Sequence, residues 1–351
     1  MKLHSETLGK AGELLELNRL LDGREHLLVI IHNTPDPDAI ASAAALAFLA
    51  EKRTGIQSSI AYGGIIGRAE NREMIRRLNI QMKQISRISF RKYDCVALVD
   101  TQPGSGNNSL PPGVAWQIVI DHHPRRSNLR NGFVRIEPEI GATSTLLVEC
   151  LQESQIDIPA DLATALAFAI TSETQNLLRE TTRRDIDAYM FVYQRSNIRK
   201  LAQIASPRLR HPYFEALSKT LSRARIYRNV ICAHIGKIPT PETVSEMANF
   251  LLRHERVGWC LCSGHFRNRL IISLRSSKPN AKANELIKAL VPGMNTVGGH
   301  DMSAGGYIPL HEGKNQEFME LEIRLLRDFA FLLGYRNANW KPLLETRDSP
   351  Q

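Results

Sequence analysis

The sequence lacks the cysteine pattern of a structural zinc site or a disulfide framework. Five cysteines are spread over 351 residues, and the close pair Cys260 and Cys262 has no second pair to complete a four-ligand site. Several cysteines stand in apolar stretches, which favours reduced and buried thiols in a cytoplasmic protein. Zinc-ribbon proteins and disulfide-bonded secreted scaffolds are therefore excluded.

Long apolar runs and aromatic residues are also scarce. No stretch approaches the ~20 apolar residues that a membrane-spanning helix needs, and the N-terminus lacks the apolar core of a signal peptide. Aromatic residues make up 6% of the chain, and no aromatic-rich groove for stacking successive bases is evident. We therefore predict a cytoplasmic protein with no membrane partner.

Length and charge indicate the general class of protein. A chain of 351 residues is long for a single core, so two domains are expected. The hydrophobic fraction of 43% and the charged fraction of 23% are ordinary for a globular protein. A net charge of +9 suits a polyanionic substrate such as RNA, DNA or a nucleotide, although mild basicity is also common among cytoplasmic proteins.

The order of apolar runs predicts the fold. Up to Asp121, short runs rich in branched residues alternate with helical patterns, as in a doubly wound parallel sheet. From Gly141 the pattern becomes helical, and Ser206-Pro207 and His211-Pro212 then interrupt it. We predict an α/β catalytic domain over 1–200, a helical linker over 201–215, a smaller C-terminal α/β domain over 216–340 and a tail over 341–351.

Polar clusters directly follow three of the predicted strands. Because the carboxyl ends of parallel strands share one crevice, these side chains are expected to converge. Carboxylates and imidazoles suit Mn²⁺ or Mg²⁺, and two such ions can activate a water for phosphoester cleavage. Asp38 has the simpler alternative of capping the helix that follows it. The clusters are His32, Asp36 and Asp38 after Ile31, Asp100 after Val99, and Asp121, His122 and His123 after Ile120.

These clusters resemble the first three motifs of the DHH phosphoesterase superfamily. The segments that carry the resemblance are 32–39, Val99-Asp100 and Asp121-His122-His123. Residues 273–276 and 297–306 are similar to the C-terminal DHH-associated domain of the nanoRNase and RecJ-like nuclease branch. The resemblance extends from about His26 to Leu310 and implies an active-site cleft between two domains.

The resemblance also implies roles for individual residues. His32, Asp36 and Asp100 would ligate one metal ion, while Asp38, the bridging Asp100 and His122 would hold a second. His123 would contact the scissile phosphate, with Asp121 supporting it. The substrate end away from the cut would be held by Arg275, Ser276, Gly298, Gly299 and His300.

The fourth motif departs from the family pattern. Where the family usually has Thr-Asp-Thr, this chain has Ser172-Glu173-Thr174. Glu173 keeps the charge and the oxygen ligands but is longer by one methylene. It would therefore either complete the second metal site or mark a weakened site or a changed metal preference. A polar residue that simply ends a helix is the remaining alternative.

The resulting hypothesis is a phosphodiesterase of the exonuclease or oligoribonuclease type. It would hydrolyse short RNA or DNA oligonucleotides or linear dinucleotides to mononucleotides by two-metal activation of water. Mn²⁺ is the expected cofactor, with Mg²⁺ or Co²⁺ as alternatives, and a homodimer is compatible with the resemblance. The alternatives are a cyclic dinucleotide phosphodiesterase, a 3′-phosphoadenosine 5′-phosphate phosphatase, an inorganic pyrophosphatase or polyphosphatase, and a non-catalytic nucleotide- or RNA-binding protein with a degenerate metal site.

Overall fold

The computed structural model describes residues 10–129, 132–178, 180–294, 296–299, 301–310 and 315–344. The chain divides into two compact units, Met1–Pro207 and Arg208–Gln351. The division falls inside the predicted linker over 201–215, between helices α7 (Ile198–Ala205) and α8 (His211–Arg223). Each unit is described separately below.

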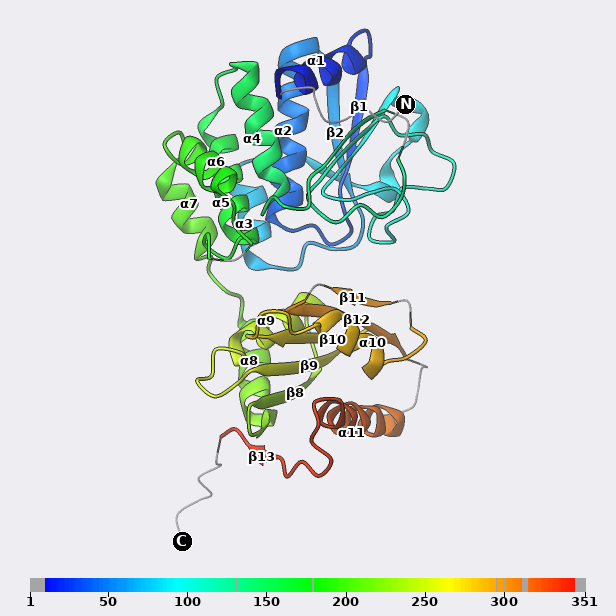
Figure 1. Ribbon diagram of the computed structural model, residues 1–351, viewed down its shortest axis with the longest axis vertical. Helices are drawn as coiled ribbons and strands as arrows, with labels where there is room; N and C mark the ends of the chain where they lie inside the picture. The colour runs from blue at the N-terminus through cyan, green and yellow to red at the C-terminus, as the bar shows by residue number, and fades with distance from the viewer. Residues whose placement is uncertain are drawn as a thin grey trace. The chain divides into compact units, whose positions relative to one another are not determined.

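The first unit is built on a parallel sheet, which confirms the predicted fold class. Its six strands follow the order β3-β2-β1-β4-β5-β6, and every neighbouring pair is parallel. Figure 1 labels β1 and β2 of this sheet. The order reverses between β1 and β4, where open α/β sheets place their ligands. The strands are β1 (His26–Ile30), β2 (Gln57–Tyr62), β3 (Met82–Gln84), β4 (Cys95–Val99), β5 (Ile118–Asp121) and β6 (Phe133–Ile136).

Both faces of this sheet are covered, which explains the continuous apolar runs of its strands. Leu27 and Val29 of β1 belong to the large core cluster that includes the helices. Leu28 and Ile30 point the other way and belong to a second cluster, packed with residues of the 3₁₀ turns η1 (Ile85–Arg87) and η2 (Phe90–Lys92) and of the loop before β5. The helices are α1 (Lys10–Leu21), α2 (Pro37–Thr54), α3 (Ala69–Arg77), α4 (Thr143–Ser154), α5 (Ala160–Glu173), α6 (Arg183–Tyr193) and α7.

Helix α2 begins inside the first polar cluster. Pro37 occupies its first turn, and the Asp36 carboxylate caps it by accepting a hydrogen bond from the Ala39 amide at 3.0 Å. Gly55 ends it in the left-handed region at φ 75°. The helix is rich in alanine, so it packs closely against α4 and α5. The cap of α2 and the polar cluster after β1 therefore share one short loop.

A buried ionic network joins β6, α4 and α6. Arg135 and Glu149 are 6% and 4% exposed, and their side chains pair at 2.5 Å between Nη2 and Oε2. Arg184 of α6 pairs with the same Glu149 oxygen at 2.6 Å. Because each buried charge has a partner, the network holds these three elements together without leaving an uncompensated ion.

The second unit contains a mixed seven-stranded sheet in the order β11-β12-β10-β9-β8-β7-β13. Only the β8–β9 pair is parallel among the pairs described. Its helices are α8, α9 (Glu242–Leu251), α10 (Ala283–Leu290) and α11 (Asn315–Leu332). The strands are β7 (Arg225–Tyr227), β8 (Val230–Lys237), β9 (Trp259–Phe266), β10 (Arg269–Ser276), β11 (Val297–Gly299), β12 (Ser303–Pro309) and β13 (Lys341–Pro342).

The burial of the cysteines and the lengths of the helices agree with the predictions from the sequence. All five cysteines lie in the described part of the chain, where each is buried and unpaired. Within the described ranges, no helix combines the length and the apolar character that crossing a bilayer requires.

Candidate metal centre

The three polar clusters meet at the carboxyl edge of the first sheet. They follow β1, β4 and β5, which are adjacent strands beside the point where the strand order reverses. Asp38, Asp100 and Asp121 are each 1% exposed, so this is a desolvated group of carboxylates. Such a group is costly unless cations or hydrogen-bond donors compensate the charge.

Asp100 lies between two sets of possible ligands. Its Oδ2 is 3.4 Å from His32 Nε2, which is also 3.4 Å from Asp36 Oδ2. Its Oδ1 is 3.6 Å from His122 Nε2. The ligand atoms of His32, Asp36 and Asp100 lie within 4.8 Å of one another, as do those of Asp100, His122 and His123. One carboxylate thus belongs to both sets.

The backbone at Asp100 is held in an uncommon conformation. Its φ of 57° lies in the left-handed region, which aspartate tolerates better than most residues. The Asp100 amide donates to the Ile120 carbonyl at 2.9 Å, and the Thr143 hydroxyl donates to Asp100 Oδ1 at 2.8 Å. These contacts fix the carboxylate directly beyond the end of β4.

Two histidines turn Nδ1 toward a backbone carbonyl and Nε2 toward the carboxylates. His32 Nδ1 lies 3.0 Å from the Asn33 carbonyl, and His122 Nδ1 lies 3.2 Å from the Ile140 carbonyl. A carbonyl only accepts, so each Nδ1 carries the proton in the neutral ring and each Nε2 keeps its lone pair. His122 Nε2 is buried with no hydrogen-bond partner among the described residues. This donor set fits divalent metal ions, since backbone carbonyls commonly orient metal-ligating histidines in this way.

Asp38 is held by the start of α4. Its two oxygens accept hydrogen bonds from the amides of Thr143 at 2.7 Å and Ser144 at 2.8 Å. These amides are among the unpaired donors at a helix N-terminus, where the helix dipole also favours an anion. The alternative that Asp38 caps the helix following it is therefore wrong, because Asp36 caps α2. His122 Nε2 lies 4.0 Å from Asp38 Oδ2.

Glu173, at the end of α5, faces the same group of charges. Burial and the negative charges of Asp36 and Asp38 raise the pKa of Glu173 to about 8. Burial and the charge of Asp100 likewise raise the pKa of Asp38 to about 7. These shifts arise where carboxylates repel one another out of water, and a bound dication removes that repulsion.

A second chain of hydrogen bonds runs through His123. Its Nδ1 lies 2.8 Å from Asp121 Oδ1, and Asp121 Oδ2 accepts a hydrogen bond from Gln102 Nε2 at 2.7 Å. Burial alone would lower the pKa of His123, but the bond to Asp121 and the charge of Asp100 raise it to about 9. Gln102 is 1% exposed, and its oxygen accepts from the Arg126 amide at 3.0 Å.

Sequence reasoning missed the supporting roles of Gln102 and Asn71. The one sequence feature that pointed to Gln102 as a site residue is its position two residues after Asp100, just past the end of a strand. Asn71 is 4% exposed and its amide donates to the Pro35 carbonyl at 2.9 Å, so it secures the loop that carries Asp36 and Asp38.

Two of the predicted substrate-binding side chains lie at the end of β10, in the second unit. Arg275 donates through Nε to Asn249 at 2.9 Å and through Nη1 to the Leu274 and Ala304 carbonyls. Ser276 is 2% exposed, and its hydroxyl donates to the Gly258 carbonyl at 3.0 Å. Both side chains fasten neighbouring strands and loops, and the arrangement gives no support to a substrate contact by Ser276.

The predicted glycine-rich segment forms β11. A Cβ on Gly299 would lie 2.2 Å from the Ser303 carbonyl oxygen, so the close approach to β12 requires glycine there. Gly298 has open space at the corresponding position. Val297, which precedes these glycines, packs into the core of the unit. His300 lies outside the described residues.

Comparison with known families matches each unit to a named domain. The profile described as "DHH family, N-terminal domain" matches residues 26–170, and the "DHHA1 domain" profile matches residues 228–328. An uncharacterized protein of Methanocaldococcus jannaschii is 34% identical over 288 residues, which cover 81% of this chain and 58% of that protein. A "probable manganese-dependent inorganic pyrophosphatase" of Lactobacillus delbrueckii subsp. bulgaricus is 29% identical over 184 residues, covering 52% of this chain and 55% of that protein.

Solved structures agree with this assignment at the level of the fold. An exopolyphosphatase-related protein from Bacteroides fragilis superposes with a TM-score of 0.74 at 15% identity, covering 94% of this chain and all of that one. By contrast, the chain spans less than two thirds of the length of the two relatives above. The chain belongs to the DHH family, with a DHH family N-terminal domain followed by a DHHA1 domain.

Proposed function

We propose that this protein is a metal-dependent phosphodiesterase that hydrolyses short oligonucleotides or linear dinucleotides to mononucleotides. The observation that carries the proposal is the position of Asp100, whose two oxygens face two separate sets of ligand atoms. A shared carboxylate between two such sets is typical of two-metal phosphoesterases. Manganese is the favoured metal because it accepts both carboxylate and imidazole, and because a related pyrophosphatase is named as manganese-dependent.

The ligand sets divide between two ions. His32, Asp36 and Asp100 would hold one ion, and Asp38, Asp100 and His122 would hold the other, which Glu173 would complete. When bound, two divalent ions activate a water and stabilise the charge that develops on the phosphoryl oxygens.

The chain's own groups orient the substrate phosphate. His123 donates its Nδ1 proton to Asp121, so its Nε2 faces away from that carboxylate. Held in this orientation by Asp121, His123 would contact a phosphate oxygen through Nε2. Gln102 holds Asp121 from the other side and so fixes the ring plane of His123.

Two features support a nucleotide substrate over inorganic pyrophosphate. The match to the pyrophosphatase covers 52% of this chain, whereas the DHHA1 domain extends over residues 228–328. The net charge of +9 suits a polyanion, and the open backbone at Gly298 permits close approach of a phosphate or base. A cyclic dinucleotide or 3′-phosphoadenosine 5′-phosphate would use the same metal ligands.

The test is hydrolysis of a substrate panel with added Mn²⁺. The panel contains a 5′-phosphorylated RNA dinucleotide, a longer RNA, a single-stranded DNA, a cyclic dinucleotide, 3′-phosphoadenosine 5′-phosphate and pyrophosphate. The wild type is compared with His122→Gln and with the matched control His211→Gln, whose side chain is 85% exposed on α8. We expect mononucleotide release that His122→Gln abolishes and His211→Gln preserves. Cleavage of pyrophosphate alone, or tight binding of the dinucleotide without turnover, would overturn the proposal.

A further inference from the structure

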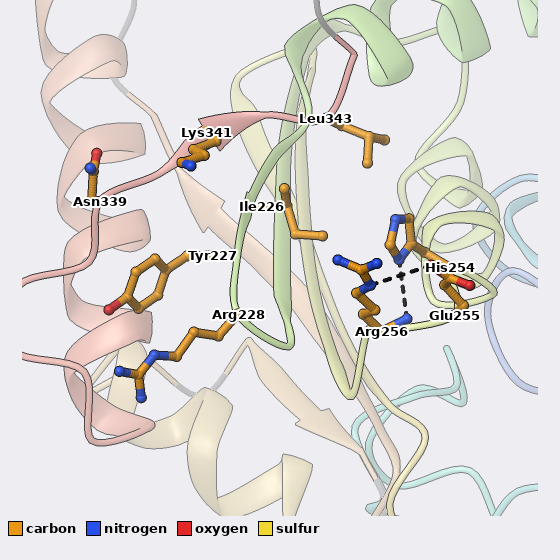
Figure 2. Close-up of a pocket in the computed structure, with 9 residues that line it drawn as sticks. All are labelled: Ile226, Tyr227, Arg228, His254, Glu255, Arg256, Asn339, Lys341 and Leu343. Atoms are coloured by element: carbon orange, nitrogen blue, oxygen red, sulfur yellow. Dashed lines mark hydrogen bonds and ion pairs between the residues drawn. The ribbon is translucent and has the colours of Figure 1, made fainter.

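The second unit contains a pocket that the proposed function does not use. It has a volume of about 690 Å³, which is within the range of small-molecule sites. Figure 2 shows Tyr227, Arg228, Asn339 and Lys341 along one side, and His254, Glu255 and Arg256 on the other. The pocket lies where β7 pairs with β13, and the turn between α9 and β9 supplies the opposite wall.

The pocket is remote from the glycine-rich strand of the same unit. In the strand order, β11 stands at one end of the sheet and β7 and β13 stand at the other. Five strands separate β11 from β13 in that order. A ligand in this pocket would therefore not contact Gly298 or Gly299.

The charge of the pocket favours an anion. Arg228, Arg256 and Lys341 are exposed cations, and Glu255 is the one carboxylate among the lining residues. Glu255 pairs with Arg256 at 3.3 Å. Neither Arg228 nor Lys341 pairs with a carboxylate anywhere in the part of the chain that the structure describes. These two cations are therefore available to phosphate oxygens.

An ordered aromatic cluster stands beside these cations. The Tyr227 ring lies 5.5 Å from Tyr335 and 6.1 Å from Trp340 between centroids. The Arg228 guanidinium lies over both tyrosines, at 5.6 Å and 5.3 Å from their centroids. Aromatic rings and arginine planes are the surfaces on which unpaired bases stack. The packing holds Tyr227 in place before any ligand arrives.

We propose that this pocket is a second nucleotide-binding site, which takes one unit of a single-stranded nucleic acid or a free nucleotide. The base would stack on the surface formed by Tyr227 and Arg228, and Lys341 and Arg256 would take the phosphate. The Asn339 amide both donates and accepts, so it suits the polar edge of a base. A site at this edge would hold nucleic acid independently of the metal centre.

The test is fluorescence anisotropy of a labelled 12-nucleotide RNA with EDTA present, so that metal-dependent binding and hydrolysis do not contribute. Arg228→Glu/Lys341→Glu is compared with Lys219→Glu/Lys288→Glu, an equal charge change at exposed positions outside the pocket. We expect the pocket variant to bind at least tenfold more weakly, with a salt dependence of the binding constant reduced by about two ions, because each lost phosphate contact removes about one. Tyr227→Leu, checked for an unchanged melting temperature, should also weaken binding.

Competition by unlabelled mononucleotide identifies the source of the ligand. Displacement of the RNA by millimolar nucleotide monophosphate would assign the pocket to free nucleotides as well as strands. Displacement by oligonucleotides alone would assign it to strands. If both double variants weakened RNA binding equally, binding would depend on the overall positive charge of the protein and not on the pocket, and the proposal would be overturned. An unchanged affinity in the pocket variant would also overturn it.

Discussion

Asp100→Asn should remove both metal ions, although it changes a single group. The Asp100 oxygens lie 3.4 Å from His32 Nε2 and 3.6 Å from His122 Nε2, so an ion bound by either imidazole also faces this carboxylate. Because Asp100 is 1% exposed, water does not screen it. Two unit charges about 4 Å apart attract by about 4 kcal/mol at an effective dielectric constant of about 20, and a dication doubles that value.

The expected loss follows from this attraction. If desolvation and the dipole of the new amide offset half of it, about 4 kcal/mol remain, which corresponds to roughly 1,000-fold in affinity. Asparagine also tolerates the left-handed backbone at this position and can still accept the hydrogen bond from Thr143, so the fold should persist.

The assay is a titration with Mn²⁺ followed by calorimetry and by the paramagnetic resonance of the free ion. The wild type should bind two ions, Asp36→Asn one tightly, and Asp100→Asn none with comparable affinity. Asp187→Asn, a change to an exposed carboxylate on α6, should keep both and serves as the control. If Asp100→Asn retains one ion at the wild-type affinity, Asp100 is not shared and the two-ion arrangement is wrong.

Three further predictions concern pH, orientation and stability. In the metal-free protein the pKa values of Asp38 and Glu173 are raised to about 7 and about 8, so the folded state binds more protons than the unfolded chain between about pH 4 and pH 8. Urea unfolding in EDTA should therefore show a free energy of unfolding that falls as pH rises through this window. An increase with pH would contradict the charges assigned to these two groups. Gln102→Leu should lower kcat by about 10- to 100-fold while two Mn²⁺ ions still bind, because it frees Asp121 and hence His123. An unchanged kcat would show that the His123 imidazole needs no support from Gln102. Glu149→Gln should reduce the free energy of unfolding by about 3 kcal/mol, since it leaves buried Arg135 short of a charge, with activity per folded molecule retained.

Much of the metal centre was predictable because its signals are local. Branched apolar runs identified β1, β4 and β5 as buried strands, and the polar residue types directly after them identified the edge at which they converge. The parallel order of the sheet then brings Asp36, Asp100 and His122 together. The ligand roles themselves stay predictions until metal is measured.

The supports of the site were not predictable, because their partners are distant in sequence. Thr143 and Ser144 look like an ordinary helix start, and nothing near them shows that their amides bind Asp38. Gln102 reaches Asp121 across two neighbouring strands. The substrate role that the resemblance implies for Ser276 stays a prediction, and its buried hydroxyl donates to the Gly258 carbonyl.

The contact between Asp38 and α4 also determines when the site can exist. The carboxylate and the amide of Thr143 are 105 positions apart, and the intervening chain contributes five of the six strands of the sheet. Closing so long a separation is slow compared with forming local structure. During synthesis, Asp38 leaves the ribosome long before the helix that fixes it. Manganese uptake should therefore mark the completion of the first unit and not its nucleation. The ions would protect the finished fold by mass action without hastening the steps that lead to it.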